Sequence, residues 1–337
     1  LVLLLGDARQ GEDVQEKEEH DGDLEQGVAR CVARLDLLGP VAELRAVPGG
    51  ERVGIVGVGG AVDVVLPRRL GLIVCGNNID QKLVVDSYRK FQENPGFVNP
   101  RYAITFFDTN LIGCMSTILN IAGPSFTVGG ASASGNLGIY NALRQLRDGE
   151  VDICLVLGPM ANFSELELQA FSCLGALSSH LYDAFPEKAC RPFDSGHNGF
   201  VFGQGSGCII LETESSVLKR GVEPWGIINS ASIVLDGNFS SDPSMDGEFS
   251  SMRLALEKAH ITPEKIDYVN AHGTSSPLGD ITEIKAIEKL FGSRSSEVYI
   301  NSTKALTGHC IYSAGVIEAI AVLIQMKEGF LHCNPNL

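Results

Sequence analysis

From about residue 70 to the last residue, short apolar runs alternate with amphipathic stretches, and this alternation constrains the fold more than any other feature. LGLIVCG (70–76), VDICLVLG (151–158) and GCIILE (207–212) have the length and composition of buried strands. Residues 135–148 follow one run and precede another with the periodicity of a helix. Strands that alternate with helices form βαβ units, so the sequence predicts an α/β protein with mostly parallel sheets and helices on both faces.

The second half of the chain continues this alternation. WGIINSASIVLDG (225–237) and IDYVNAHG (266–273) read as strands, and 247–260 and 313–329 as helices. Between them, a helix over 280–292 is predicted to be closed by a glycine and to turn four apolar residues toward the core: Ile281, Ile284, Ile287 and Phe291.

Charge and composition exclude several classes of protein. The net charge of −15 argues against nucleic acid as a main partner. No apolar run approaches the roughly 20 residues of a membrane span, so no membrane association is expected. The nine cysteines are scattered without a CxxC pair, which predicts small buried apolar residues, no metal site, no cofactor and a reducing, cytoplasmic location.

Residues 1–69 differ in kind from the rest. They contain no Ser, Thr, Asn or aromatic residue, and the first aromatic side chain of the chain is Tyr88. The opening LVLLLG is too short for a secretory signal. Gly57 and Gly59 begin a dinucleotide-binding fingerprint, but Val62 stands where its third glycine belongs. We expect a poorly ordered leader here, in which 51–65 contributes a strand and a turn.

The stretch PSFTVGGASASGN (124–136) predicts a strand that runs directly into a glycine- and serine-rich turn and then a helix. In open α/β sheets, active groups collect at such carboxyl ends of strands. NAHG and TKALTGH, which carry His272 and His309, also follow predicted strands. By residue type alone, Ser132 is a helix N-cap and the two histidines are loop residues.

Four longer stretches occur together in one order: GPSFTVGGASASG, RPFDSGHNGFVFGQGSG, NAHGTSSPLGDITEIKAI and NSTKALTGHCIYSAGVIEAI. In order and spacing this set resembles the β-ketoacyl synthases, the condensing enzymes of fatty-acid and polyketide assembly. The resemblance runs from about residue 70 to the end. It implies the thiolase fold, layered α/β/α/β/α, with an N-terminal half to about residue 212 and a C-terminal half from about residue 225.

The resemblance assigns roles to individual residues. Ser132 stands where the family has the cysteine that carries the acyl chain. The two catalytic histidines of the family fall on His272 and His309, its supporting lysine on Lys304, and its acidic residue on Glu318. In two further departures, His197 stands where arginine is usual, and Gln204 where glutamate is usual.

The serine at position 132 changes the expected chemistry. A cysteine at a helix N-terminus forms a thiolate near neutral pH, whereas a serine hydroxyl without a bonded base is a poor nucleophile. Decarboxylation of a malonyl thioester needs only donors for the enolate oxygen, and two imidazole N–H groups supply them. The chain is therefore similar to the serine-bearing, non-condensing homologues of polyketide β-branching cassettes. That likeness implies malonyl-acyl carrier protein as substrate, acetyl-acyl carrier protein as product, and a homodimer.

Two alternatives remain open. One is residual condensing or acyl-transfer activity through Ser132, with His272 or His309 as its base. The other is a non-catalytic partner subunit like the chain-length factors, which generally lack the histidine pair. The chain also departs from the family at both ends: it stops at LHCNPNL, before a glycine-rich segment of its relatives, and residues 1–69 replace their N-terminal strand and helix.

Overall fold

The computed structural model describes residues 2–6, 33–34, 53–56, 66–238 and 241–337. The strands are β1 Val2–Gly6, β2 Ala33–Arg34, β3 Val53–Val56, β4 Leu70–Cys75, β5 Ser125–Val128, β6 Ile153–Gly158, β7 Gly207–Thr213, β8 Gly226–Ser232, β9 Tyr268–Asn270, β10 Tyr299–Asn301 and β11 Phe330–Leu331. The α-helices are α1 Gln81–Glu93, α2 Tyr102–Thr105, α3 Thr109–Leu119, α4 Ser134–Arg147, α5 Glu165–Cys173, α6 Glu214–Arg220, α7 Met245–Ala259, α8 Pro277–Phe291, α9 Lys304–Thr307 and α10 Ala314–Glu328.

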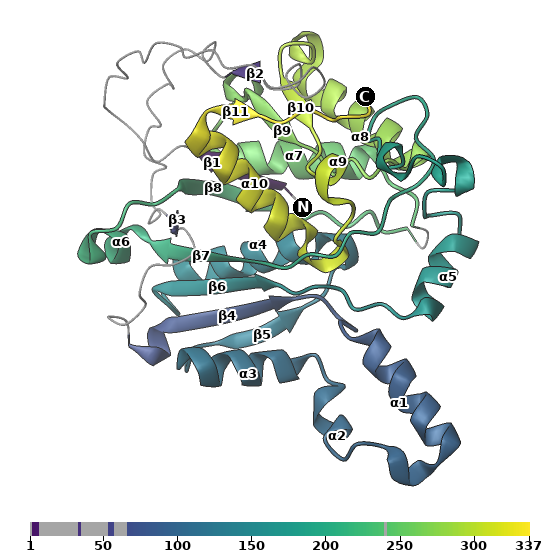
Figure 1. Ribbon diagram of the computed structural model, residues 1–337. Helices are drawn as coiled ribbons and strands as arrows, with labels where there is room; N and C mark the ends of the chain where they lie inside the picture. The colour runs from purple at the N-terminus through teal and green to yellow at the C-terminus, as the bar shows by residue number, and fades with distance from the viewer. Residues whose placement is uncertain (1, 7–32, 35–52, 57–65, 239–240) are drawn as a thin grey trace, which may run out of the picture.

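A seven-stranded sheet in the order β1-β8-β3-β7-β6-β4-β5 forms the centre of the molecule (Figure 1). β4 pairs in parallel with both β5 and β6, as the alternation of strands and helices predicts. β6 pairs with β7 in antiparallel orientation. β3 pairs antiparallel with both β7 and β8, and β1 pairs antiparallel with β8. β9 and β10 form a separate parallel pair, and β11 pairs antiparallel with β2. The sheet therefore carries its parallel part around β4, where β5 delivers the serine turn.

Helices cover both faces of the parallel part of the sheet. All six residues of β4 are buried, because successive side chains alternate between two covered faces. Ile73 and Cys75 pack in the cluster that α4 and α10 close, while Leu70, Leu72 and Val74 pack in the cluster on the side of α3. Figure 1 shows α3 beneath the sheet and α4 above it.

The helix that follows the serine turn approaches its neighbours unusually closely. In α4, Ile139, Ala142, Leu143 and Leu146 are buried at helical spacing and form its core-facing stripe. A Cβ on Gly135 would lie 2.7 Å from the backbone nitrogen of Val316 in α10. A side chain there would push the two helices apart, so this glycine fixes the position of the turn rather than loosening it.

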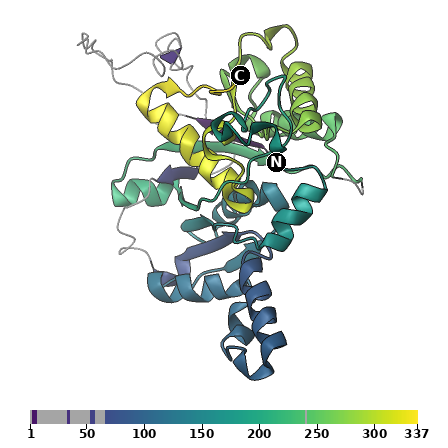
Figure 2. The ribbon, with the colours of Figure 1, turned by 45° about the vertical axis from the view of Figure 1, so that its right-hand side comes forward.

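The upper part of the molecule carries α7 and α8 against β9 and β10 (Figure 1). Its own core contains Ala271, Ile287, Phe291 and Val298, with Val269 and Ile300 of the strands packed against them. At the opposite end, α1 and α2 extend away from the body of the molecule (Figure 2).

The helix predicted over 280–292 forms as α8 and is closed by Gly292 with φ +55°. The prediction that four apolar residues face the core is wrong for Ile281, which is 49% exposed. The inner side of the first turn carries Asp280 instead, which is buried and bonded to neighbouring loops. Ile281, next to it, turns outward.

Most of residues 1–69 lie outside the described residues, and so does most of the leader predicted there. The described segments β1 and β3 both belong to the central sheet, and β3 coincides with the strand expected within 51–65. Within the described part of the chain, none of the helices is both long and apolar enough to cross a bilayer.

Candidate active site

The turn after β5 holds Ser132 in a short 3-10 helix, Ala131–Ala133, that leads directly into α4. Ala131 adopts φ +46°, a left-handed conformation that costs energy for a residue with a Cβ. Ser134 holds this conformation: its Oγ accepts the N–H of Gly130 at 2.9 Å and donates to the carbonyl of Ala131 at 2.7 Å. The strained turn is therefore fixed by a hydroxyl two residues beyond Ser132.

Ser132 does not cap the helix, contrary to the expectation from residue type alone. The residue at the N-cap of α4 is Ala133, and it provides no side-chain cap. The hydroxyl oxygen of Ser132 instead lies 2.8 Å from Nε2 of His309, 177 residues further along the chain. The structure thus brings together two residues that the sequence only associated by motif.

The backbone around His309 fixes which ring nitrogen carries the proton. His309 is held by its N–H to the carbonyl of Val201 and by its carbonyl to the N–H of Gly203. The backbone N–H of Ile311 donates to Nδ1 of His309 at 3.1 Å. Because Nδ1 accepts this bond, the neutral ring carries its hydrogen on Nε2. His309 therefore donates to Ser132, and Ser132 accepts.

The conformation of Ile311 explains how its N–H reaches the ring. Ile311 adopts φ +52°, which is a marked outlier for a β-branched residue. Such strain persists only where the surrounding structure imposes it. Here it turns the backbone N–H back onto the imidazole two residues earlier, and so sets the direction of the bond to Ser132.

Lys304 orients the second histidine. It is 1% exposed at the start of α9, and its Nζ lies 3.3 Å from Nδ1 of His272 and 2.7 Å from the carbonyl of the same residue. A third donor of the ammonium pairs with Glu318 in α10. Since an ammonium has three donors and no acceptor, Nδ1 of His272 accepts and its Nε2 carries the hydrogen.

The two imidazoles are neighbours, and both are held neutral. Their ring centroids lie 5.5 Å apart in a T-shaped arrangement, and the ring of Phe200 stacks edge-on against His309 at 5.3 Å. The surrounding protein desolvates both rings and, with the charge of Lys304, lowers both pKa values well below the usual range. As a residue, His272 is nevertheless solvent-exposed.

The loop that carries His272 is clamped by α8. Glu283 accepts the N–H of His272 at 2.6 Å and that of Gly273 at 2.8 Å. Burial raises the pKa of Glu283, and the two N–H groups oppose that rise by favouring its charged form. The carboxylate thereby fixes the backbone position from which the imidazole of His272 extends.

Asp280, one helical turn earlier, joins a second loop to the first. It is 2% exposed and accepts the N–H groups of Thr274, Ser275 and Phe193 at 3.0, 3.1 and 2.7 Å. His197, which stands where the family has arginine, places its Nδ1 3.2 Å from the same carboxylate. Gln204, the other departure, is exposed.

Asp280 and Glu283 are the functional residues to which the sequence analysis gave no role. Both appear in the quoted stretch NAHGTSSPLGDITEIKAI, and their i, i+3 spacing on a helix was the available signal. What the spacing does not show is that their partners are backbone N–H groups of two loops.

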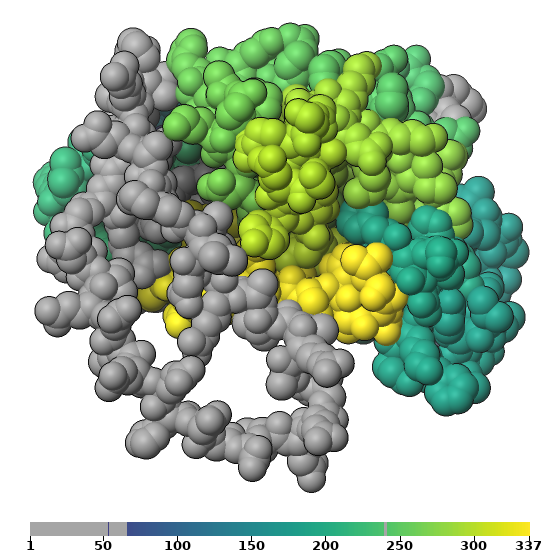
Figure 3. Space-filling view, turned by 90° about the horizontal axis from the view of Figure 1, so that it is seen from above, coloured from purple at the N-terminus to yellow at the C-terminus, as the bar shows by residue number. Residues whose placement is uncertain are grey.

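The end of the chain closes the loops from above. Figure 3 shows the last residues, in yellow, between the light-green region of α8 and the teal segment before β7. Asn336 donates to the carbonyls of Glu187 and Cys190 at 2.8 and 2.9 Å, and Asn334 accepts the N–H of Ser302 at 3.1 Å. These bonds tie the segment before Lys304 to the segment before His197.

Three cysteines lie in strands of the central sheet. Burial raises the pKa of Cys75 and Cys154 to about 12 and that of Cys208 to about 11, which makes them inert thiols. The expectation of buried cysteines is wrong for Cys114 and Cys173, which are exposed. No cluster of three metal-ligating side chains is found among the residues that the structure describes.

Comparison with solved structures and known proteins places this site in a class. The fold matches a β-ketoacyl synthase from Burkholderia phymatum STM815 with a TM-score of 0.75 and 26% identity, over 82% of this chain and 67% of that one. It also matches a type II polyketide synthase ketosynthase solved in complex with its acyl-carrier protein, with a TM-score of 0.71 and 23% identity, over 81% and 68% of the two chains. The chain has the thiolase-like ketosynthase fold.

The sequence identifies the family. Residues 68–216 match the N-terminal domain of β-ketoacyl synthases and residues 225–337 match the C-terminal domain. The chain is also 43% identical, over 269 residues, to the polyketide biosynthesis malonyl-ACP decarboxylase PksF of Bacillus subtilis (strain 168). That match covers 80% of this chain and 64% of the relative's length. This protein belongs to the β-ketoacyl synthase family.

Proposed function

We propose that this protein removes CO2 from malonyl-acyl carrier protein and releases acetyl-acyl carrier protein, a lyase reaction of polyketide biosynthesis, without forming a carbon–carbon bond. One observation carries the proposal: the hydroxyl of Ser132 accepts a hydrogen bond from His309, because Nδ1 of that ring is already occupied by a backbone N–H. The relative PksF is named for this activity.

The geometry accounts for the absence of condensation. Condensation begins with attack on an acyl thioester, and a serine needs a base to take its proton. The nitrogen nearest to Ser132 already carries a hydrogen, and desolvation lowers the pKa of its ring. His309 is therefore a donor at this position, so the serine lacks the base that acylation requires.

Decarboxylation uses the donors that the site offers. The bond between C2 and the carboxyl carbon of the malonyl group breaks and CO2 leaves. The electron pair of the broken bond stays with C2 and is delocalised onto the thioester oxygen as an enolate. The negative oxygen is stabilised by the Nε2–H of His272 and, on the other side of the site, by the hydrogen-bonded pair of His309 and Ser132, each donor being worth roughly 3 kcal/mol. A proton from solvent then adds to C2 and gives the acetyl group. Lys304 supports the reaction by holding the tautomer of His272.

The carrier protein is proposed as the partner on two grounds. PksF is named as acting on malonyl-ACP, and a structural neighbour was solved with its acyl-carrier protein bound. The site is assembled from both halves of the chain, since Ser132 follows β5 while His272, Lys304 and His309 follow β9 and β10. We propose residues 70–212 and 225–337 as the two halves. Of residues 1–69, β1 and β3 pair within the central sheet and so belong to the same domain.

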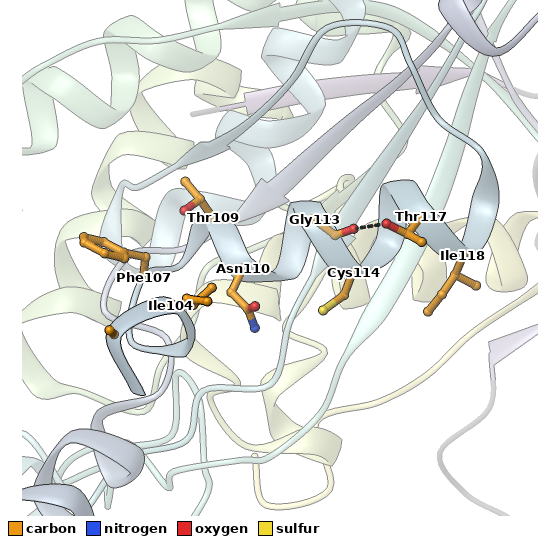
Figure 4. Close-up of a pocket in the computed structure, with 9 residues that line it drawn as sticks. Ile104, Phe107, Thr109, Asn110, Gly113, Cys114, Thr117 and Ile118 are labelled. Carbon is orange, nitrogen blue, oxygen red and sulfur yellow. Dashed lines mark hydrogen bonds between the residues drawn. The ribbon is translucent and has the colours of Figure 1, made fainter. Parts of the chain in front are cut away.

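A homodimer is also proposed, formed through β5 and α3. β5 is the edge strand of the sheet, so one of its sides presents unpaired backbone groups. Next to it, Ile104, Phe107 and Ile118 line an open groove of about 720 Å³ along α2 and α3 (Figure 4). Pairing of β5 with its copy across a two-fold axis would satisfy the edge and cover the groove.

Free, exposed Cys114 and Cys173 support a reducing location, for which we propose the cytoplasm.

The test is the product formed from malonyl-carrier protein by the purified chain. Acetyl-carrier protein without acetoacetyl-carrier protein supports the proposal. An acetoacetyl product, or an acyl adduct on Ser132 found by mass spectrometry, would establish residual condensing activity instead. No product at all would favour a non-catalytic partner subunit.

A further inference from the structure

The bonds around Ser132 run in one direction. The N–H of Ile311 donates to Nδ1 of His309, and Nε2–H of His309 donates to the oxygen of Ser132. The hydrogen of the Ser132 hydroxyl takes no part in this series of hydrogen bonds. Among the residues that the structure describes, no acceptor bonds to it.

A second donor at the site is free in the same way. Nδ1 of His272 accepts from Lys304, and within the described part of the chain nothing accepts the hydrogen on its Nε2. The ring of His272 contacts that of His309, and the residue His272 is exposed while Ser132 is partly exposed. Two uncommitted donors, the O–H of Ser132 and the N–H of His272, therefore both lie next to His309, whose own N–H is already committed.

We propose that Ser132 is a catalytic residue that donates its O–H to the enolate oxygen, and that His309 acts through Ser132 rather than on the substrate directly. This inference rests on the proposed decarboxylation. A hydroxyl that accepts a hydrogen bond becomes a stronger donor, so the bond from His309 polarises the O–H that faces the substrate. Direct donation by His309 would instead require its 2.8 Å bond to the serine to break.

We call the series from the N–H of Ile311 through His309 to the hydroxyl of Ser132 the relay. It gives the oxygen at position 132 a role in catalysis. A thiol is a weak hydrogen-bond donor and a thiolate has no hydrogen to donate, so cysteine cannot take this place. On this view, serine both removes the nucleophile and adds a donor to the enolate site. Ser132 and His272 then donate to the substrate. His309 donates to Ser132, and Lys304 donates to His272.

A double-mutant cycle on the full chain tests the relay. Ser132→Ala, His309→Ala and the double variant are assayed with malonyl-carrier protein, and kcat and KM are compared with those of the wild type. Each single variant should lose about 10²-fold in kcat with little change in KM. Because both residues act in one chain, the double variant should also lose about 10²-fold. A loss of about 10⁴-fold would show independent donors and overturn the relay.

Further variants separate this inference from other outcomes. Ser132→Thr keeps a hydroxyl and should recover most of the rate lost in Ser132→Ala. Ser296→Ala, at an exposed serine in the loop before β10, is the matched control and should keep the kcat of the wild type. Full activity of Ser132→Ala overturns the relay while leaving decarboxylation intact. A wild type that forms no acetyl product overturns both.

Discussion

At the scale of single residues, the direction of a hydrogen bond decides what this site can do. The distance of 2.8 Å between Ser132 and His309 alone would be compatible with a serine activated by a base. The N–H of Ile311 excludes that interpretation, because it occupies the nitrogen that would otherwise carry the hydrogen. Lys304 has the same effect on His272. Both imidazoles thus carry their hydrogen on Nε2, that of His309 donated to Ser132 and that of His272 without an acceptor in the described residues, so neither can take the proton of a nucleophile.

Replacement of His272 tests this assignment at the second imidazole. If its Nε2–H stabilises the enolate, His272→Ala should lower kcat by about 10²-fold and leave KM almost unchanged, since the interaction forms mainly in the transition state. Steady-state kinetics with malonyl-carrier protein measures both. His180→Ala, at an exposed histidine, is the control and should behave as the wild type. A lower melting temperature with a proportionate loss of folded protein would instead mark His272 as a structural loop residue.

At the scale of elements, α8 acts as the frame of the site. Asp280 and Glu283 lie one turn apart and accept backbone N–H groups from two loops, so the position of one helix sets the position of His272. A carboxylate suits this task because both of its oxygens accept, and bonds of this charge-assisted kind are about twice as strong as neutral ones. The polar first turn also explains why Ile281 points outward.

Glu283 bonds to the loop that carries His272, so Glu283→Gln should impair catalysis even though this residue has no assigned contact with the substrate. The amide keeps one acceptor but turns an NH2 group toward a backbone N–H, which displaces His272 or Gly273. We expect about a tenfold loss in kcat. Glu288→Gln, on the exposed side of the same helix, should leave kcat unchanged. Equal kinetics for the two variants would show that the clamp does not position the imidazole.

The elements were largely predictable from the sequence, whereas the site was predictable only in part. The apolar runs that became β4 and β6 are buried almost throughout, and that of β7 is buried or partly buried along its length, so their composition identifies them. Ser132, His272, His309 and Lys304 were found through their motifs, and the structure brings all four together. The roles of Ile311 and Glu283 were not predictable, because a left-handed backbone and a bond to a loop N–H leave no mark in residue type.

At the scale of the whole molecule, one buried acid links stability to pH. Glu248 in α7 is partly buried, and its Oε2 has no hydrogen-bond partner among the described residues. Desolvation, with the charges of Glu283 and Asp236, raises its pKa from 4.5 to about 8. The folded protein thus keeps a proton that the unfolded chain releases above 4.5. The stability contributed by this group is complete below pH 4.5 and is lost as the pH rises to about 8.

The free energy of unfolding should therefore carry a falling component between about pH 5 and 8, measurable by urea denaturation at a series of pH values. Glu248→Gln removes the titrating group and should flatten this component. Glu257→Gln, at an exposed position of the same helix, should leave the profile of the wild type unchanged. An unaltered slope in Glu248→Gln would mean that Glu248 ionises in the folded protein as it does in the unfolded chain.

The proposed dimer depends on the surface next to β5, and Ile118 offers the sharpest probe of it. Its side chain is 74% exposed at the end of α3, where it lines the groove beside the edge strand (Figure 4). In a dimer, Ile118→Glu would bury an unpaired carboxylate, so the dissociation constant should rise at least about tenfold. Leu218 in α6 is equally exposed at 74% and lies outside the groove, so Leu218→Glu is the matched control and should remain dimeric. Sedimentation velocity over a range of concentrations measures all three proteins. A monomeric wild type, or equal dissociation of both variants, would show that this surface does not join two copies.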